Sequence, residues 1–432
     1  MQHDLSMGSL RGLLGLGLLL LVAVAFSRNR RGIRLRTVAA ALGMQVGFAV
    51  LVLRWSPGER ALQWAADRVE TLIGYAEEGT AFVFGPLLEV GAEDNPIFAL
   101  QVLPVIVFLG ALIYLLFYLR VIQWVTFVIG GAIAKLLGVT KVESMYAATV
   151  IFLGQSEAPL MVAPYLRRLR TAQLFALMTG GFAAAAGSTL VGYSMLGTPL
   201  EYLLAATVMN APAGLLMAKI VWPDATPEPA WAKESPPGDR DASTEADADE
   251  FDVRTVRDEE SANLIDAVGR GAIAGGRIAV TVGGLLIAFI ALIAMANGIL
   301  SRVGGWVGVD GLSFEKLLGW ALAPLAWLLG VPWSESVDAG SFIGMKTVLN
   351  EFVAYAAFGP DVGDYSQVTV VIVTFALAGF ANLASIAIQI GTYSSLVPER
   401  RPHVARLGLL ALLAGSLANL ANAAIAGLVV AV

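Results

Sequence analysis

Long runs of hydrophobic residues, separated by short polar turns, make up most of the sequence. A helix needs about 17–25 mostly apolar residues to cross a bilayer. Three further apolar segments, at 143–166, 313–330 and 335–358, are too broken to be simple spans. The pattern therefore predicts an all-α polytopic membrane protein. Its eight predicted transmembrane helices are 10–26, 37–53, 97–118, 171–195, 199–221, 275–297, 366–390 and 404–430.

Polar clusters distinguish two of the broken segments, and we interpret both as re-entrant hairpins. Segment 143–166 contains Gly154-Gln155-Ser156-Glu157-Ala158-Pro159, and segment 335–358 contains Asn350-Glu351. Irregular backbone at membrane depth is tolerated where it is buried in protein or lines a cavity. An ionisable side chain at that depth costs about 2.5–3.5 kcal/mol on insertion scales, so each glutamate marks a candidate functional site.

The composition supports a membrane protein and argues against an enzyme. Only 14% of the residues are charged, whereas a soluble domain has about 25%. There is no cysteine, and the two histidines, His3 and His403, lie near chain or segment ends. The sequence therefore offers no disulfide, no thiolate nucleophile and no histidine–cysteine metal cluster. We expect a transport protein without a cofactor and without a nucleic-acid partner.

Basic residues are distributed unevenly among the turns, and this bias predicts the orientation. It is consistent along the chain if 143–166 enters and leaves the membrane on one face. The first apolar run is followed, and not preceded, by a cluster of basic residues that begins at Arg28. A cleaved signal peptide has its positive charge before the apolar run, so this order favours a retained helix. We expect a protein of the cell inner membrane with both termini outside the cytoplasm. The predicted cytoplasmic groups are Arg28–Arg36, then Arg120, Lys135 and Lys141, then Arg167, Arg168 and Arg170, then Arg400, Arg401 and Arg406.

The sequence divides into four parts. Residues 1–96 hold the N-terminal helices and a mixed segment, 59–80, that fits either an amphipathic interfacial helix or a helix packed on the protein's own rim. Residues 97–222 and 263–432 each hold one predicted hairpin. Between them, 223–262 is rich in proline and acidic residues, which predicts a disordered cytoplasmic loop.

A third polar cluster interrupts the predicted span 366–390. Asn382 and Ser385 are three residues apart and share a helix face, which Gln389 extends, and Phe380 adds an aromatic ring. Together, the three clusters contain carboxylates, amides, hydroxyls and an aromatic ring, and they contain no cationic clamp. Lys346 is the only basic candidate nearby. Carboxylates and amides suit a neutral, polyhydroxylated, partly aromatic solute, whereas an anionic solute favours arginine or lysine.

The three clusters, in this order, resemble the concentrative nucleoside transporter family over residues 97–430. The matching strings are Gly154–Leu160, Asn350–Tyr355 and Gly379–Asn382 with Ser385, and the approach Met178–Ser188 also matches. The resemblance implies a homotrimer whose protomers have scaffold and transport parts, with two inverted repeats that each hold a hairpin and a partly unwound helix. It also implies nucleoside contacts, with the base at Gln155, Ser156, Glu157 and Thr189, and the ribose at Glu351, Asn382 and Ser385 with Phe380 beside them.

Two positions depart from the sodium-coupled members that the chain resembles. Those members use an asparagine where this chain has Val150, and a serine or threonine where it has Ala184. Neither valine nor alanine has a side-chain oxygen, which a hard cation requires. We therefore expect coupling to protons in preference to sodium, through Glu157 or Glu351, because burial favours a neutral carboxyl group. The alternatives are a sodium-coupled symporter and an uncoupled facilitator.

Overall fold

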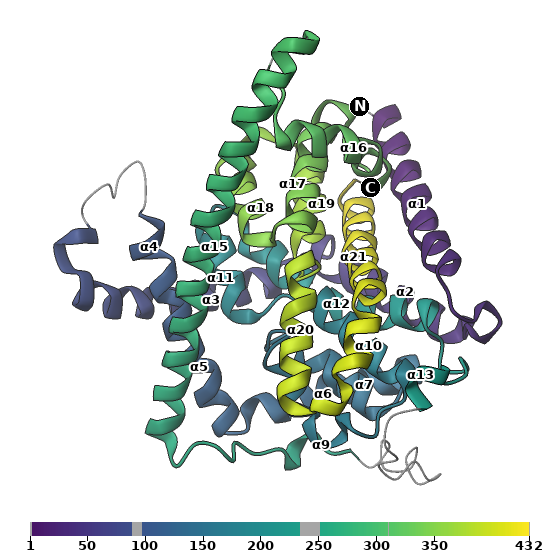
Figure 1. The fold of residues 1–432 in the computed structure, drawn as a ribbon, viewed down its shortest axis with the longest axis vertical. Helices are drawn as coiled ribbons and strands as arrows, with labels where there is room; N and C mark the ends of the chain where they lie inside the picture. Colours follow the sequence, from purple (N-terminus) through teal and green to yellow (C-terminus); the bar gives the residue numbers. More distant parts are fainter. Residues whose placement is uncertain (1, 89–96, 234–250, 310, 432) are drawn as a thin grey trace.

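The computed structural model describes residues 2–88, 97–233, 251–309 and 311–431, and every regular element in these ranges is a helix (Figure 1). In this part of the chain six helical segments are long and apolar enough to cross a membrane. Two shorter apolar helices, Leu10–Ala25 and Gln367–Leu377, coincide with the two remaining predicted spans. The six are Leu35–Leu53 (α2), Phe98–Tyr118 (α4 and α5), Thr171–Met195 (α10 and α11), Leu200–Val221 (α12), Leu264–Trp306 (in α15) and Pro398–Ala431 (with α21).

All eight predicted spans therefore coincide with apolar helices, and the all-α polytopic class is confirmed. The prediction omitted one apolar helix, α6 (Val121–Leu137). Its seventeen residues rise about 26 Å, which falls short of the roughly 30 Å hydrocarbon core. The mixed segment 59–80 lies within a longer helix, α3 (Ser56–Phe84), in which only Gly58, Ala66, Ala76 and Thr80 are buried.

Two of the predicted spans are broken in the middle. The first consists of α10 (Thr171–Ala183) and α11 (Gly187–Met195), and the second of α19 (Gln367–Leu377) and α20 (Leu383–Leu396). The first break is extended at Ala184 and Ala186, whereas the second turns tightly after Leu377 and ends in the extended Asn382. The two breaks lie against each other. A hydrogen bond of 2.9 Å from the Phe380 amide to the Ala184 carbonyl oxygen joins them.

The two predicted hairpins are helix pairs with short arms. In the first, α7 (Lys141–Thr149) has nine residues, and after an irregular turn the chain forms α8 (Ala158–Met161) and α9 (Ala163–Leu166). At 1.5 Å per residue, α7 rises only about 14 Å, so it does not cross the bilayer. The second hairpin pairs α17 (Ser336–Val348) with α18 (Glu351–Phe358), and α16 (Phe314–Leu329) precedes it.

The first broken span and α19 lie in the protein core, whereas α15 (Leu264–Val307) lies at its edge. In the most apolar stretch of the α10–α11 segment 94% of residues are buried, whereas in that of α15 only 17% are. With 44 residues, α15 is about 66 Å long and runs along one side of the molecule from end to end (Figure 1). The chain thus has an enclosed centre and an outward-facing helix beside it.

The basic turns gather at one end of the molecule, as the charge bias predicts. The Arg28 amide donates to the Val221 carbonyl, and the Arg400 guanidinium donates to the carbonyls of Arg167 and Leu169. The start of α1 (Gln2–Ala25) and the end of α21 (Arg401–Ala431) both lie at the opposite end (Figure 1).

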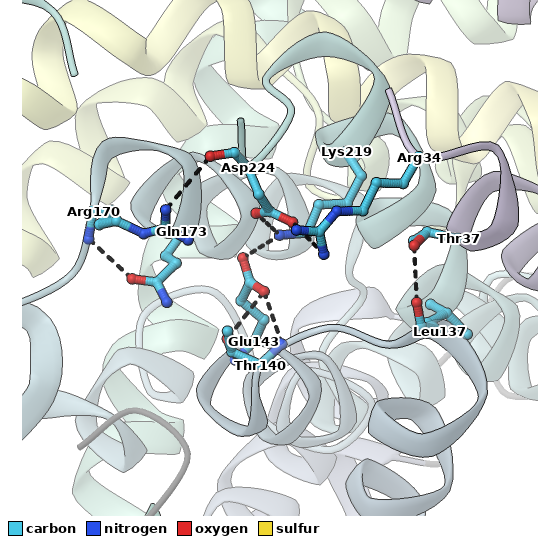
Figure 2. A network of polar contacts seen from close by, with 9 residues as sticks. All are labelled: Arg34, Thr37, Leu137, Thr140, Glu143, Arg170, Gln173, Lys219 and Asp224. Carbon is cyan, nitrogen blue, oxygen red and sulfur yellow. Dashed lines mark hydrogen bonds and ion pairs between the residues drawn. The ribbon is translucent and has the colours of Figure 1, made fainter. Parts of the chain in front are cut away.

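A buried network of ion pairs connects several elements at this basic end (Figure 2). The Lys219 ammonium on α12 lies 2.6 Å from Glu143 Oε1 and 2.5 Å from Asp224 Oδ1. Glu143 also closes a capping box with Thr140 at the start of α7, and Arg34 lies 3.8 Å from Asp224. The network therefore joins the first hairpin, α12 and the α1–α2 connection.

The flanks of the acidic loop are folded onto the protein, contrary to the expectation of disorder across 223–262. The Phe251 ring contacts Tyr165 at a centroid distance of 4.9 Å, and Val253 is fully buried. On the other flank, Glu228 accepts hydrogen bonds from the amide and hydroxyl of Thr171. Residues 234–250 lie outside the described residues, and there the expectation stays a prediction.

Candidate substrate site

One cavity of about 290 Å³ lies where the hairpins meet the two helix breaks. Side chains from both hairpins, from α11, from the break before α20 and from α15 line it. The structure thus brings together clusters that are far apart in the sequence. All eight residues predicted to contact substrate line this cavity: Gln155, Ser156, Glu157, Thr189, Glu351, Phe380, Asn382 and Ser385.

The turn of the first hairpin presents three consecutive polar side chains. Gln155 is buried and donates to the Ser385 hydroxyl at 2.9 Å, whereas Ser156 is exposed and Glu157 half-buried. Gly154 leaves room for the carboxylate in its present position, because a Cβ there would lie 2.8 Å from Glu157 Oε2 and 3.1 Å from Ala186 Cβ. The tight turn therefore lets the Glu157 carboxylate lie against the backbone.

Gln389 lies behind this turn and outside the cavity lining. Its amide donates to Gln155 Oε1 at 3.3 Å and to the Met178 carbonyl at 3.0 Å. Gln389 therefore orients the Gln155 amide from behind.

The Glu351 carboxylate is held from two sides at the start of α18. Asn382 Nδ2 donates to its Oε2 at 2.9 Å, and the Tyr193 hydroxyl donates to its Oε1 at 3.2 Å. Asn350 caps α18 by accepting from the Val353 amide, so the positive end of the helix dipole faces the carboxylate. A carboxylate has about four acceptor positions, which leaves lone pairs for hydroxyl donors of a solute.

Asn382 links the second hairpin to the broken helix. Its Oδ1 accepts from the Ser385 amide at 2.9 Å and caps α20, while its Nδ2 donates to Glu351. Ser385 in turn accepts from Gln155. One hydrogen-bonded chain therefore runs from the first hairpin through the α20 N-terminus to the second hairpin.

The hydroxyl of Thr189 is engaged by its own helix, and the sequence prediction missed its neighbour Tyr193. Thr189 Oγ1 donates to the Ala186 carbonyl at 2.8 Å, which leaves only its lone pairs for a solute. Tyr193 is fully buried and stacks on Tyr355 at 4.4 Å. Tyr193 lies four residues after Thr189, so both are on one helix face, and this spacing could have indicated Tyr193 as a site residue.

The basic residue that lines the cavity is Arg277, on α15, so the expectation that Lys346 is the only basic candidate near the site is wrong. Arg277 lies at the beginning of a predicted span, where the sequence does not indicate which way the side chain faces. A single arginine opposite two glutamates leaves the lining net negative, so the preference for a neutral solute over an anionic one is unchanged.

Lys346 is buried behind the site instead of lining it. Its ammonium donates to the Ala376 carbonyl at 3.0 Å and to Asn419 Oδ1 at 2.8 Å. Asn419 Nδ2 lies within hydrogen-bond distance of the Ala183 and Ala378 carbonyls. These carbonyls belong to the two helix breaks, which need side-chain partners away from water.

The two positions that depart from the sodium-coupled pattern are deeply buried. Val150 follows the last residue of α7 and is 2% exposed, and Ala184 follows the last residue of α10 and is 1% exposed. The Ala184 carbonyl oxygen is occupied by the Phe380 amide. Both side chains consist of carbon and hydrogen alone, so neither can coordinate a cation.

Comparison with known proteins identifies the family. Residues 202–427 match the family model described as "Na+ dependent nucleoside transporter C-terminus", 14–87 match its N-terminus, and 99–199 match "Nucleoside recognition". The nucleoside permease NupC of Helicobacter pylori is 41% identical, with 97% of each chain covered. The chain belongs to the concentrative nucleoside transporter family. Its relatives are transporters, so the prediction of a transport protein and not an enzyme is confirmed.

Solved structures in the family share the whole fold. CNTnw in an inward-facing substrate-bound state is 45% identical, with 98% of each chain covered and a TM-score of 0.88. A double variant of CNTnw, solved in an outward-facing state, gives the same TM-score of 0.88 at 44% identity, again with 98% of each chain covered. The uncharacterized transporter YutK of Bacillus subtilis is 48% identical over 98% of this chain and 100% of its own length.

Proposed function

We propose that the protein imports nucleosides of the uridine, cytidine and adenosine class by alternating access and couples uptake to protons. The observation that carries the nucleoside assignment is the single cavity lined by all three polar clusters. Membership of a nucleoside transporter family supports the same substrate class.

The polar set of the cavity divides between base and ribose. Gln155, Ser156 and Glu157 offer an amide, a hydroxyl and a carboxylate to the edge of a base, with Thr189 beside them. Glu351 accepts from ribose hydroxyls, and Phe380 packs against the sugar and base. Asn382 and Ser385 hold the ribose at the α20 N-terminus. Asn382 and Ser385 also fix the positions of Glu351 and of the first hairpin, because Asn382 bonds to Glu351 and Ser385 bonds to Gln155.

Alternating access fits the way the site is built. Both hairpins and both broken helices contribute to the cavity, whereas one wall comes from α15 at the edge of the molecule. Movement of the first group past α15 exposes the same cavity to either side. CNTnw has been solved in inward-facing and outward-facing states. We further propose that the basic end faces the cytoplasm of an inner-membrane protein and that the chain assembles as a homotrimer.

The absence of oxygen side chains at Val150 and Ala184 favours the proton as the coupling ion. Glu351 already accepts two hydrogen bonds, while Glu157 lies half-buried at the turn of the first hairpin. Protonation of either carboxylate removes the cost of moving a bare charge through the apolar part of the protein. Substrate hydroxyls provide the remaining compensation at Glu351.

Separate ion gradients test the coupling. In proteoliposomes, an inward proton gradient without sodium should drive uridine accumulation, and a sodium gradient at equal pH should not. A protonophore should abolish the accumulation while leaving exchange of internal and external uridine intact. Strong accumulation driven by sodium alone would instead support the sodium-coupled alternative, and equilibration without accumulation would support a facilitator.

Restoring the two oxygen side chains should bring back a sodium response. The double variant Val150→Asn with Ala184→Ser supplies two oxygen ligands at buried positions. We expect sodium to stimulate its uridine uptake several-fold at constant pH, with no effect of sodium on the parent protein. Val150→Leu with Ala184→Val is the matched control, because it changes volume without adding oxygen. Equal sodium responses of the two double variants would contradict the role of these positions.

A further inference from the structure

A second hollow, of about 490 Å³, lies at the basic end of the molecule, away from the substrate cavity. Residues from the α1–α2 connection, from the segment after α12 and from α21 line it. Its lining includes Arg28, Trp222, Thr226, Trp231, Arg406 and Leu410. None of these residues takes part in the substrate site, so the hollow needs an explanation of its own.

Two guanidinium groups face this hollow from different elements. Arg28 lies over the Trp222 ring at 5.8 Å, and Arg406 lies over the Trp231 ring at 5.3 Å. Both side chains are exposed, and within the described residues neither forms an ion pair. Stacking on an indole holds each guanidinium plane and leaves its N–H donors available for an anion.

The nearby acidic side chains are already engaged. Asp224 is bound by Lys219 at 2.5 Å, and Glu228 accepts from the amide of Thr171 at 2.9 Å. Among the described residues, neither carboxylate forms an ion pair with Arg28 or Arg406. The hollow thus offers two guanidinium cations.

The position of the hollow and its apolar half indicate the ligand. It lies where three apolar helices end or begin, next to Ala25, Val221 and Arg401. Tryptophan is enriched at this level of a membrane, and basic pockets between helices bind anionic headgroups. Leu407 and Leu410 line one wall, and the neighbouring Leu409 is 70% exposed, which provides a surface for an acyl chain.

We propose that this hollow binds the phosphate of an anionic phospholipid. Arg28 and Arg406 clamp the phosphate, and an acyl chain runs along α21 past Leu410. Free phosphate shares the headgroup chemistry but lacks the chain. The lipid would link the α1–α2 connection to α21, so it should also stabilise the protein.

Lipid retention by the full-length protein tests this assignment. Purified protein is exchanged into nanodiscs of phosphatidylcholine with and without phosphatidylglycerol, and bound phosphatidylglycerol is quantified by native mass spectrometry after release into detergent. The Arg28→Gln, Arg406→Gln double variant should bind phosphatidylglycerol on the order of 30-fold more weakly, which corresponds to about 1 kcal/mol for each basic residue near the membrane surface. Its uridine uptake in phosphatidylcholine should match the parent, which shows that it is folded.

The Arg36→Gln, Arg401→Gln double variant is the matched control. It removes the same charge from the same end, and both residues are exposed and lie outside the hollow. We expect it to retain phosphatidylglycerol as the parent does. If both double variants lost phosphatidylglycerol equally, the effect would come from the overall charge of this end, and the proposed site would be wrong. Displacement of the lipid by inorganic phosphate at similar concentrations would overturn the lipid assignment in favour of free phosphate.

Discussion

Replacing Glu351 by glutamine should lower nucleoside uptake by on the order of 100-fold. The carboxylate accepts from Asn382 Nδ2 and from the Tyr193 hydroxyl, and the residue is only 5% exposed. Glutamine replaces one acceptor oxygen by a donor, which then faces the donor of Asn382 or a ribose hydroxyl. A hydrogen bond to a charged group contributes about 1.5–3 kcal/mol, so losing one or two of them accounts for this effect.

The measurement is the initial rate of uridine uptake into proteoliposomes with matched protein content. Tyr193→Phe is the comparison, because it removes one donor to Glu351 but keeps the carboxylate, and its loss should be at most about 10-fold. Thermal unfolding in detergent separates a transport defect from a folding defect. A Glu351→Gln protein that transports at nearly the parental rate would refute the ribose contact.

Most of the architecture could be predicted from the sequence because a membrane span imposes a long, simple pattern. The eight apolar runs coincide with helices, and the polar clusters around Glu157, Glu351 and Asn382 line one cavity. The reason is energetic, since polar side chains at membrane depth need one another or a water-filled space. The same rule that made them conspicuous along the chain brings them together in the fold.

The sequence was less informative where tertiary contacts decide. Arg277 lies in an apolar run, and only the packing of α15 turns it toward the cavity. Lys346 is the only basic candidate that the sequence places near the site, but it donates to the Ala376 carbonyl and to Asn419 behind the cavity. Tyr193 is a common residue in an apolar helix, and its role depends on the distant Glu351. Each of these contacts joins residues that no local pattern connects.

The helix breaks explain why buried polar residues extend beyond the cavity. Each break leaves backbone groups without helical partners, and in an apolar interior these must be satisfied by side chains. Asn419 serves carbonyls from both breaks, at Ala183 and Ala378. The irregular backbone that forms the substrate site is therefore supported by a second set of amides behind it.

The ion network at the basic end predicts a large loss of stability for Lys219→Met (Figure 2). The ammonium lies within 2.6 Å of both Glu143 and Asp224, and the side chains of Lys219 and Glu143 are 5% and 0% exposed. Removing one partner of a buried ion pair leaves an uncompensated charge and typically costs about 3–5 kcal/mol. Methionine keeps most of the side-chain volume, so the loss reports the charge and not a cavity.

Neutralising the opposing charge should recover much of this loss. In Lys219→Met with Glu143→Gln, the glutamine amide can still accept from Thr140, and Asp224 keeps Arg34 at 3.8 Å. Unfolding of the purified proteins, followed by heat or denaturant in the same detergent, should therefore rank the parent first, the double variant second and Lys219→Met last. A single variant as stable as the parent would contradict the role of the network. Because Lys219 on α12 fixes the start of α7, uridine uptake should follow the same order, which connects the basic end to the position of the first hairpin in the substrate cavity.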